Sequence, residues 1–94
     1  MAPAPEPTHL NNHHRDTLAK IFQHPVSHNI EWGPVVSLLE AVGTLTRRHD
    51  GLYVATVGDE KETFERPKTK DIDAQQVVDL RRLLEKAGYG PPGP

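Results

Sequence analysis

The chain has 94 residues, of which 35% are hydrophobic and 26% are charged, and its net charge is −2. This length allows one small domain with a single core, and no apolar run approaches the roughly 18 residues that a membrane-spanning helix needs. The absence of cysteine excludes disulfide bonds and thiolate metal sites. We therefore expect a soluble, cytoplasmic protein without a membrane partner, and the charge argues against indiscriminate nucleic-acid binding.

Proline-rich ends delimit the predicted domain. Residues 1–12 and 90–94 are rich in proline and lack a periodic apolar pattern, so we expect disordered tails there. One α+β domain is expected over residues 13–89. Within it, Leu18, Ile21 and Phe22 follow the i, i+3, i+4 spacing of a short amphipathic helix between His14 and Gln23.

A longer helix is predicted from Asn29, a favourable N-cap residue, to Gly43, which is placed at the C′ position. Its tryptophan, Trp32, has two interpretations. The ring either anchors the first helix to this one, which we favour, or presents an aromatic contact to a partner.

Three β-rich runs follow, at 44–48, 52–57 and 60–65, and the turn residues between them predict an antiparallel meander. Alternation places Tyr53, Ala55 and Val57 on one face. The third run has one large apolar residue, Phe64, and is predicted to be an edge strand.

The last helix carries the clearest local signals. Asp73 and Gln76 have the spacing of a capping box, Ile72 and Val77 that of a hydrophobic staple, and Gly88 closes the final turn. The predicted order is a short helix followed by α-β-β-β-α. We expect the two longer helices to pack on one face of a three-stranded antiparallel sheet.

This order resembles that of double-stranded-RNA-binding domains and of the HicA toxins of bacterial toxin–antitoxin pairs. Leu38-Leu39-Glu40-Ala41-Val42-Gly43 is similar to the end of the first HicA helix. Lys70-Asp71-Ile72-Asp73, continued by Leu80 to Tyr89, is similar to its last helix. The resemblance covers residues 30–89. It implies a small ribonuclease that cleaves messenger RNA without a metal or cofactor and is neutralised by an antitoxin protein.

The catalytic turn departs from the family. HicA toxins usually carry Gly-Ser-His at the first hairpin turn, whereas this chain has His49-Asp50-Gly51 and places Gly51 at the histidine position. His49 is therefore the candidate catalytic residue, because histidine can serve as acid or base near neutral pH and Arg47 and Arg48 are adjacent. The alternative interpretation of the same residues is a polar hairpin turn.

The candidate RNA-binding residues are basic or aromatic and fall between the second and last helices: Arg47, Arg48, Tyr53, Arg66, Lys68 and Lys70. A solvated surface of mixed charge is the alternative for the cations, and a half-buried core position is the alternative for Tyr53. His24 and His28 have a spacing that invites a metal interpretation. We expect no metal site, because four fixed ligands are lacking.

Two function classes remain open from the sequence. One is a HicA-like RNA-binding protein that acts as a messenger-RNA interferase, and the other is a non-catalytic module that binds a protein partner or RNA. The apolar face of the first helix must also be buried. The body of the domain, a symmetric homodimer and the surface that an antitoxin would use are the three candidates.

Overall fold

The computed structural model describes residues 10–23 and 29–90. The elements follow the predicted order: α1 (Asn12–Ile21), α2 (Trp32–Val42), β1 (Thr44–Arg47), β2 (Tyr53–Val57), β3 (Glu60–Phe64) and α3 (Ala74–Lys86). The predicted α+β class and the helix–α-β-β-β-α order are thus confirmed. The predictions that concern residues 1–9, 24–28 and 91–94, including those for His24 and His28, lie outside the described residues.

The three strands form an antiparallel sheet in the order β1-β2-β3, so β3 is an edge strand as expected. Arg47 of β1 and Phe64 of β3 lie on either side of Tyr53 in the register. Both turns have a glycine in the left-handed region, Gly51 at φ 90° and Gly58 at φ 61°. These left-handed conformations favour glycine, because the Cβ atom of any other residue would clash with the backbone.

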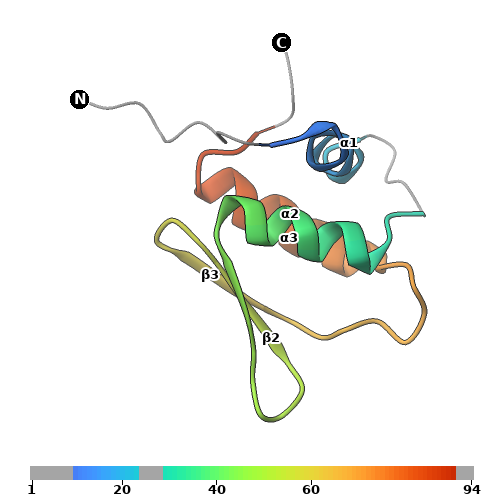
Figure 1. The fold of residues 1–94 in the computed structure, drawn as a ribbon, viewed down its shortest axis with the longest axis vertical. Coiled ribbons are helices and arrows are strands. Elements are labelled where there is room, and N and C mark those ends of the chain that lie inside the picture. Colours follow the sequence, from blue (N-terminus) through green and yellow to red (C-terminus); the bar gives the residue numbers. More distant parts are fainter. Residues whose placement is uncertain (1–9, 24–28, 91–94) are drawn as a thin grey trace.

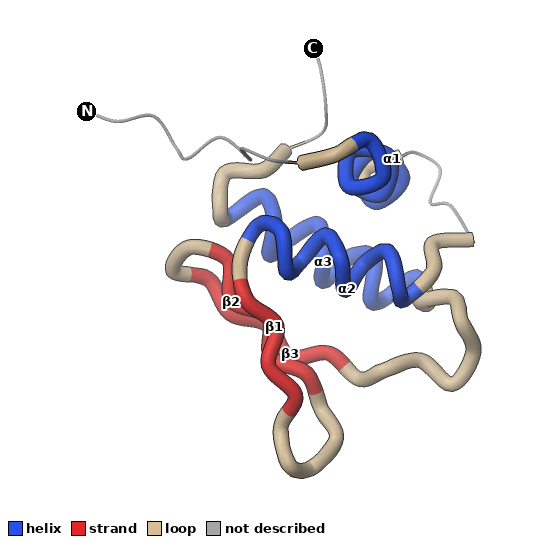
Figure 2. Tube along the Cα trace, viewed as in Figure 1, coloured by secondary structure: helices blue, strands red, loops and turns tan. Residues whose placement is uncertain are grey.

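The longer helices cover one face of the sheet (Figures 1 and 2). Contacts join α2 to β1 and β2, and α3 to β3. The strand residues directed at the helices form the sheet's share of the core, and Ala55, Val57 and Phe64 are buried there. None of the helices in the described part of the chain covers the opposite face (Figure 2), whose residues include several threonines: Thr44, Thr46, Thr56 and Thr63.

Helix α1 forms a third layer on the side of α2 and α3 away from the sheet (Figure 1). Leu18 and Ile21 are buried in the common core. At the other end of the helix, the His14 Nε2 atom lies 2.8 Å from the Ser37 hydroxyl of α2. Of the three places considered for the apolar face of α1, the body of the domain is the one that the structure shows.

The beginning of the domain and of α2 differ from the predictions. The predicted boundary at residue 13 falls inside α1, because Leu10 is buried and Asn11 accepts a hydrogen bond from the His14 amide as the N-cap. For α2, the N-cap is Glu31 rather than Asn29, and its side chain makes no capping bond.

Gly43 ends α2 for a different reason from the predicted one. Its φ of −167° is extended, not left-handed, so it does not form the expected C′ turn. A Cβ atom at Gly43 would overlap the backbone carbonyl oxygen of Thr56 on β2. Glycine is needed here because the backbone at the end of α2 lies directly against strand β2.

The start and end of α3 confirm the local signals. Asp73 accepts a hydrogen bond from the Gln76 amide at 2.8 Å, and the Gln76 side chain accepts one from the Asp73 amide at 3.1 Å. Ile72 and Val77 are both buried, and Gly88 has φ 97°. This helix therefore begins and ends where its own sequence directs it.

Candidate nucleic-acid interface

A short backbone bridge joins the segments that precede α2 and α3. Glu31 and Asp71 pair in antiparallel fashion. The Trp32 amide donates to the Lys70 carbonyl at 2.7 Å, and the Ile72 amide donates to the Ile30 carbonyl at 2.9 Å. The first turns of the two helices are therefore held together, and both helices run from this point in the same direction (Figure 1).

The basic connector, residues 66–70, leads from β3 to this bridge. Its three cationic side chains, Arg66, Lys68 and Lys70, are exposed. Within residues 10–23 and 29–90 no hydrogen bond or ion pair engages any of these three side chains. Unpaired surface cations of this kind are available to phosphate groups.

A pocket of about 460 Å³ lies between the connector and the start of α2. We call it the α2 pocket, and it is lined by Glu31, Trp32, Gly33, Arg66, Pro67, Lys68, Thr69 and Lys70. Its lining contains three cations and one carboxylate. An anionic ligand is thus favoured by the charge of its walls.

A second pocket, of about 360 Å³, lies on the other side of the connector against α3. Arg66 and Lys68 line it too, but so do the carboxylates Glu65, Asp71, Asp73 and Asp79. One oxygen of Asp71 is also buried, and it has no hydrogen-bond partner among the described residues. These carboxylates oppose an anion, so the α2 pocket is the better site for a phosphate.

Tyr53 packs against Trp32 across the helix–sheet interface. Their ring centroids are 5.4 Å apart and the rings are inclined by 68°, an edge-to-face arrangement. Tyr53 is half-buried and belongs to the inner face of the sheet. The ring contact of Trp32 thus joins α2 to the sheet, whereas an anchor between α2 and α1 was expected from the sequence.

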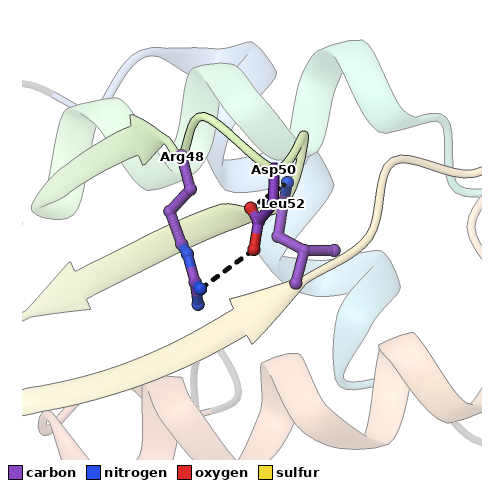
Figure 3. A network of polar contacts seen from close by, with 3 residues as sticks. All are labelled: Arg48, Asp50 and Leu52. Carbon is purple, nitrogen blue, oxygen red and sulfur yellow. Dashed lines mark hydrogen bonds and ion pairs between the residues drawn. The ribbon is translucent and has the colours of Figure 1, made fainter.

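The first hairpin turn is closed by its own polar side chains (Figure 3). Asp50 accepts a hydrogen bond from the Leu52 amide at 3.1 Å and forms an ion pair with Arg48 at 2.9 Å. The Gly51 amide donates to the Arg48 carbonyl at 3.0 Å. The carboxylate of Asp50 therefore stabilises the turn and pairs with the guanidinium of Arg48.

The His49 ring is exposed at the tip of this turn. No described residue forms a hydrogen bond or ion pair with it. Arg47 is exposed too and carries no such partner among the described side chains. The hairpin tip extends away from the helices and lies apart from the connector (Figure 2).

The structure therefore places the predicted site residues in three positions. Arg47, Arg48 and His49 lie at the hairpin tip, Tyr53 lies against α2, and the three connector cations border the pockets. Glu31 and Gly33 line the α2 pocket and were not predicted as site residues from the sequence. The charge of the connector indicated one wall of the pocket. The opposite wall, at the start of α2, is brought beside the connector by the backbone bridge, which the sequence does not reveal.

Among residues 10–23 and 29–90, no group of three or more histidine or acidic side chains could hold a metal ion. The helices in that part of the chain are all too short or too polar to cross a membrane. Comparisons with protein-family models, with curated proteins and with solved structures each find no match to this chain.

Proposed function

We propose that the protein binds RNA through its phosphate backbone, with the connector residues Arg66, Lys68 and Lys70 as the main contacts. The observation that carries this proposal is the set of three exposed, unpaired cations beside two pockets in the described structure. Charge-assisted contacts of this kind dominate the affinity of most RNA-binding surfaces. The α-β-β-β-α order, which resembles RNA-binding domains, supports the same function.

The hairpin tip supplies a second group of contacts. Arg47 is free to reach a phosphate, while Arg48 must exchange its ion pair with Asp50 for one with RNA. That exposed ion pair is worth little, so the exchange is inexpensive. Tyr53 supports the RNA-binding surface without contacting the RNA itself, because its ring is packed against Trp32.

Cleavage of the bound RNA is the further activity that the HicA resemblance implies. In such a mechanism His49 would take the proton of a ribose 2′-hydroxyl or protonate the leaving oxygen, and Arg47 would stabilise the phosphorane charge. Asp50 does not orient His49, since it bonds Leu52 and Arg48. This arrangement favours RNA binding over catalysis, and it agrees with the non-catalytic module as the alternative class.

The binding test compares two triple variants that remove equal charge. Arg66→Gln/Lys68→Gln/Lys70→Gln removes the connector cations, and Lys20→Gln/Arg82→Gln/Lys86→Gln removes exposed cations of α1 and α3. The affinity for a fluorescent single-stranded RNA is measured at several salt concentrations. The slope of log K against log salt is negative, and losing three phosphate contacts should reduce its magnitude by about 2 in the connector variant alone.

Equal slopes in the two variants would remove the connector from the proposal. No binding by the unaltered chain would reject RNA binding and favour a module that binds a protein partner. An antitoxin or a second copy of the chain is then the candidate, and co-expression followed by measurement of the mass of the complex would identify which one is bound.

A further inference from the structure

The two edges of the sheet differ in how they are protected against pairing with another strand. The first three residues of β3 are all charged: Glu60, Lys61 and Glu62. The first three residues of β1 are all uncharged: Thr44, Leu45 and Thr46. Charged side chains are a common device that keeps an edge strand from pairing with another chain. Most of β1 lacks this protection.

The pairing of β1 with β2 determines which backbone groups of β1 point outward. The Arg48 amide donates to the Leu52 carbonyl at 2.7 Å, so these residues form a pair of the hydrogen-bonded type. Such pairs alternate along an antiparallel ladder, and the even-numbered residues of β1 therefore face β2. The amide and carbonyl groups of Leu45 and Arg47 are directed away from β2. No strand within residues 10–23 and 29–90 pairs with that side of β1.

We propose that β1 pairs in antiparallel fashion with β1 of a second copy of the chain, which joins two three-stranded sheets into one. Such a pair has a two-fold axis, so the same residue of both copies meets at its centre. Leu45 fits this centre, because its outward backbone groups can exchange two hydrogen bonds with those of Leu45 in the second copy. Its side chain is partly buried against the core and would cover the same side chain of the other copy.

The neighbouring residues of β1 fit the register centred on Leu45. Thr44 of each copy then lies opposite Thr46 of the other, on the face away from the helices. Two threonines opposite each other are a favourable cross-strand pair. A register centred on Thr46 would instead make the two Arg47 side chains diagonal neighbours, and like charges at such positions repel.

Charge also favours a second copy as the occupant of this edge. In the register centred on Leu45, Arg47 of one copy lies opposite Gly43 of the other, at the C-terminus of α2. That helix has no basic residue in its last turn, and Glu40 is exposed there. Helix C-terminal carbonyls and carboxylates both attract a cation. Each copy thus supplies the cation that the α2 helix of the other copy lacks, and the connector on the opposite side of the sheet stays available to RNA.

Double variants at Thr44 and Thr46 test this register, because both side chains are exposed. Thr44→Lys/Thr46→Lys sets lysine against lysine on both sides of the centre and should abolish the dimer. Thr44→Glu/Thr46→Lys sets glutamate against lysine and should keep it. Thr63→Lys is the matched control, because together with Lys61 it gives β3 two lysines at the same spacing. Circular dichroism and the thermal midpoint establish that each variant is folded.

Sedimentation equilibrium without RNA measures the mass in solution. Pairing through one strand buries little area, so the dimer is weak and the protein is studied from about 10 μM to about 1 mM. We expect the mass of the unaltered chain to rise from 10.5 kDa towards twice that value. Thr63→Lys and Thr44→Glu/Thr46→Lys should do the same. Arg47→Gln should weaken the dimer about tenfold, because two contacts with helix ends are lost, and Arg48→Gln should not.

A monomer at every concentration would overturn the proposal. So would a Thr44→Lys/Thr46→Lys protein that dimerises as tightly as the unaltered chain, or a Thr63→Lys protein that loses the dimer to the same extent. Loss of the dimer in Thr44→Glu/Thr46→Lys would overturn the register centred on Leu45. Because no RNA is present, these outcomes do not depend on the proposed RNA-binding function, which the salt titration tests.

Discussion

The guanidinium of Arg81, on α3, donates a hydrogen bond from its Nε atom to the backbone carbonyl of Ile21, at the last turn of α1, at 2.5 Å. Its Nη2 atom also donates to the Gln23 carbonyl at 2.6 Å. A cation at a helix C-terminus satisfies carbonyl groups that have no partner within the helix. Arg81 thus holds α1 against the body of the domain.

Replacing Arg81 with glutamine should loosen α1. Hydrogen bonds to a charged group contribute about 1.5–3 kcal/mol, and one of these bonds is part-buried, so we expect a loss of about 2 kcal/mol in the free energy of unfolding. Urea titration of the unaltered protein and the variant measures this loss. Arg82→Gln is the control, because that side chain is exposed and bonds no other described residue. Equal losses in the two variants would show that Arg81 does not hold α1.

Gly33, in the first turn of α2, and Gly43, the residue that follows α2, should respond in opposite ways to alanine. Gly43→Ala forces a Cβ atom against the Thr56 carbonyl, so it should lower the free energy of unfolding by at least about 2 kcal/mol. Gly33→Ala meets no neighbouring atom and should raise it by up to about 1 kcal/mol. Thermal unfolding of both variants measures the difference. A stable Gly43→Ala protein would contradict the close approach of α2 and β2.

The capping box of α3 provides a third test. Asp73→Ala removes the acceptor of the Gln76 amide, and we expect a loss of about 1 kcal/mol in the free energy of unfolding. Asp73→Asn keeps an acceptor oxygen and should lose much less. Chemical denaturation of the two variants gives both values, and a similar loss in both would assign the effect to charge rather than to the cap.

These elements also explain how far the sequence predicts the fold. The start of α3 is predicted correctly because Asp73 and Gln76, the residues that determine it, are three positions apart. The start of α2 is misplaced because the Trp32 amide bonds Lys70, which is distant in the sequence. The role of Gly43 is misassigned for the same reason, since the atom that requires a glycine belongs to Thr56.

The candidate site, too, is predicted where it depends on neighbouring residues and missed where it depends on distant ones. The charge of Arg66, Lys68 and Lys70 is visible in the sequence, and so is the turn that carries His49. The pocket is not visible, because its two walls come from segments that meet only through the Glu31–Asp71 bridge. Local signals therefore identify the cations but not the space between them.

Cleavage at the hairpin tip is tested with His49→Ala. Because the ring is exposed and bonds no other described residue, the substitution should change the free energy of unfolding by less than about 0.5 kcal/mol. Unaltered protein and variant are each incubated with a long single-stranded RNA without divalent metal, and the RNA is resolved on a denaturing gel. We expect the unaltered protein and the variant both to bind RNA in the titration with fluorescent RNA, which is separate from the gel. Loss of full-length RNA with the unaltered chain alone would assign a proton-transfer role to His49, and intact RNA with both would favour the non-catalytic module.

The bridge between Glu31 and Asp71 has a consequence for the energetics of the connector. The connector begins two residues after Phe64, which is buried, and ends at Lys70, whose carbonyl accepts a hydrogen bond from the Trp32 amide. A segment anchored at both ends samples fewer backbone conformations than a free loop, so less conformational entropy is lost when it binds. The connector is thus pre-organised by the pair of backbone hydrogen bonds that holds its end against the start of α2.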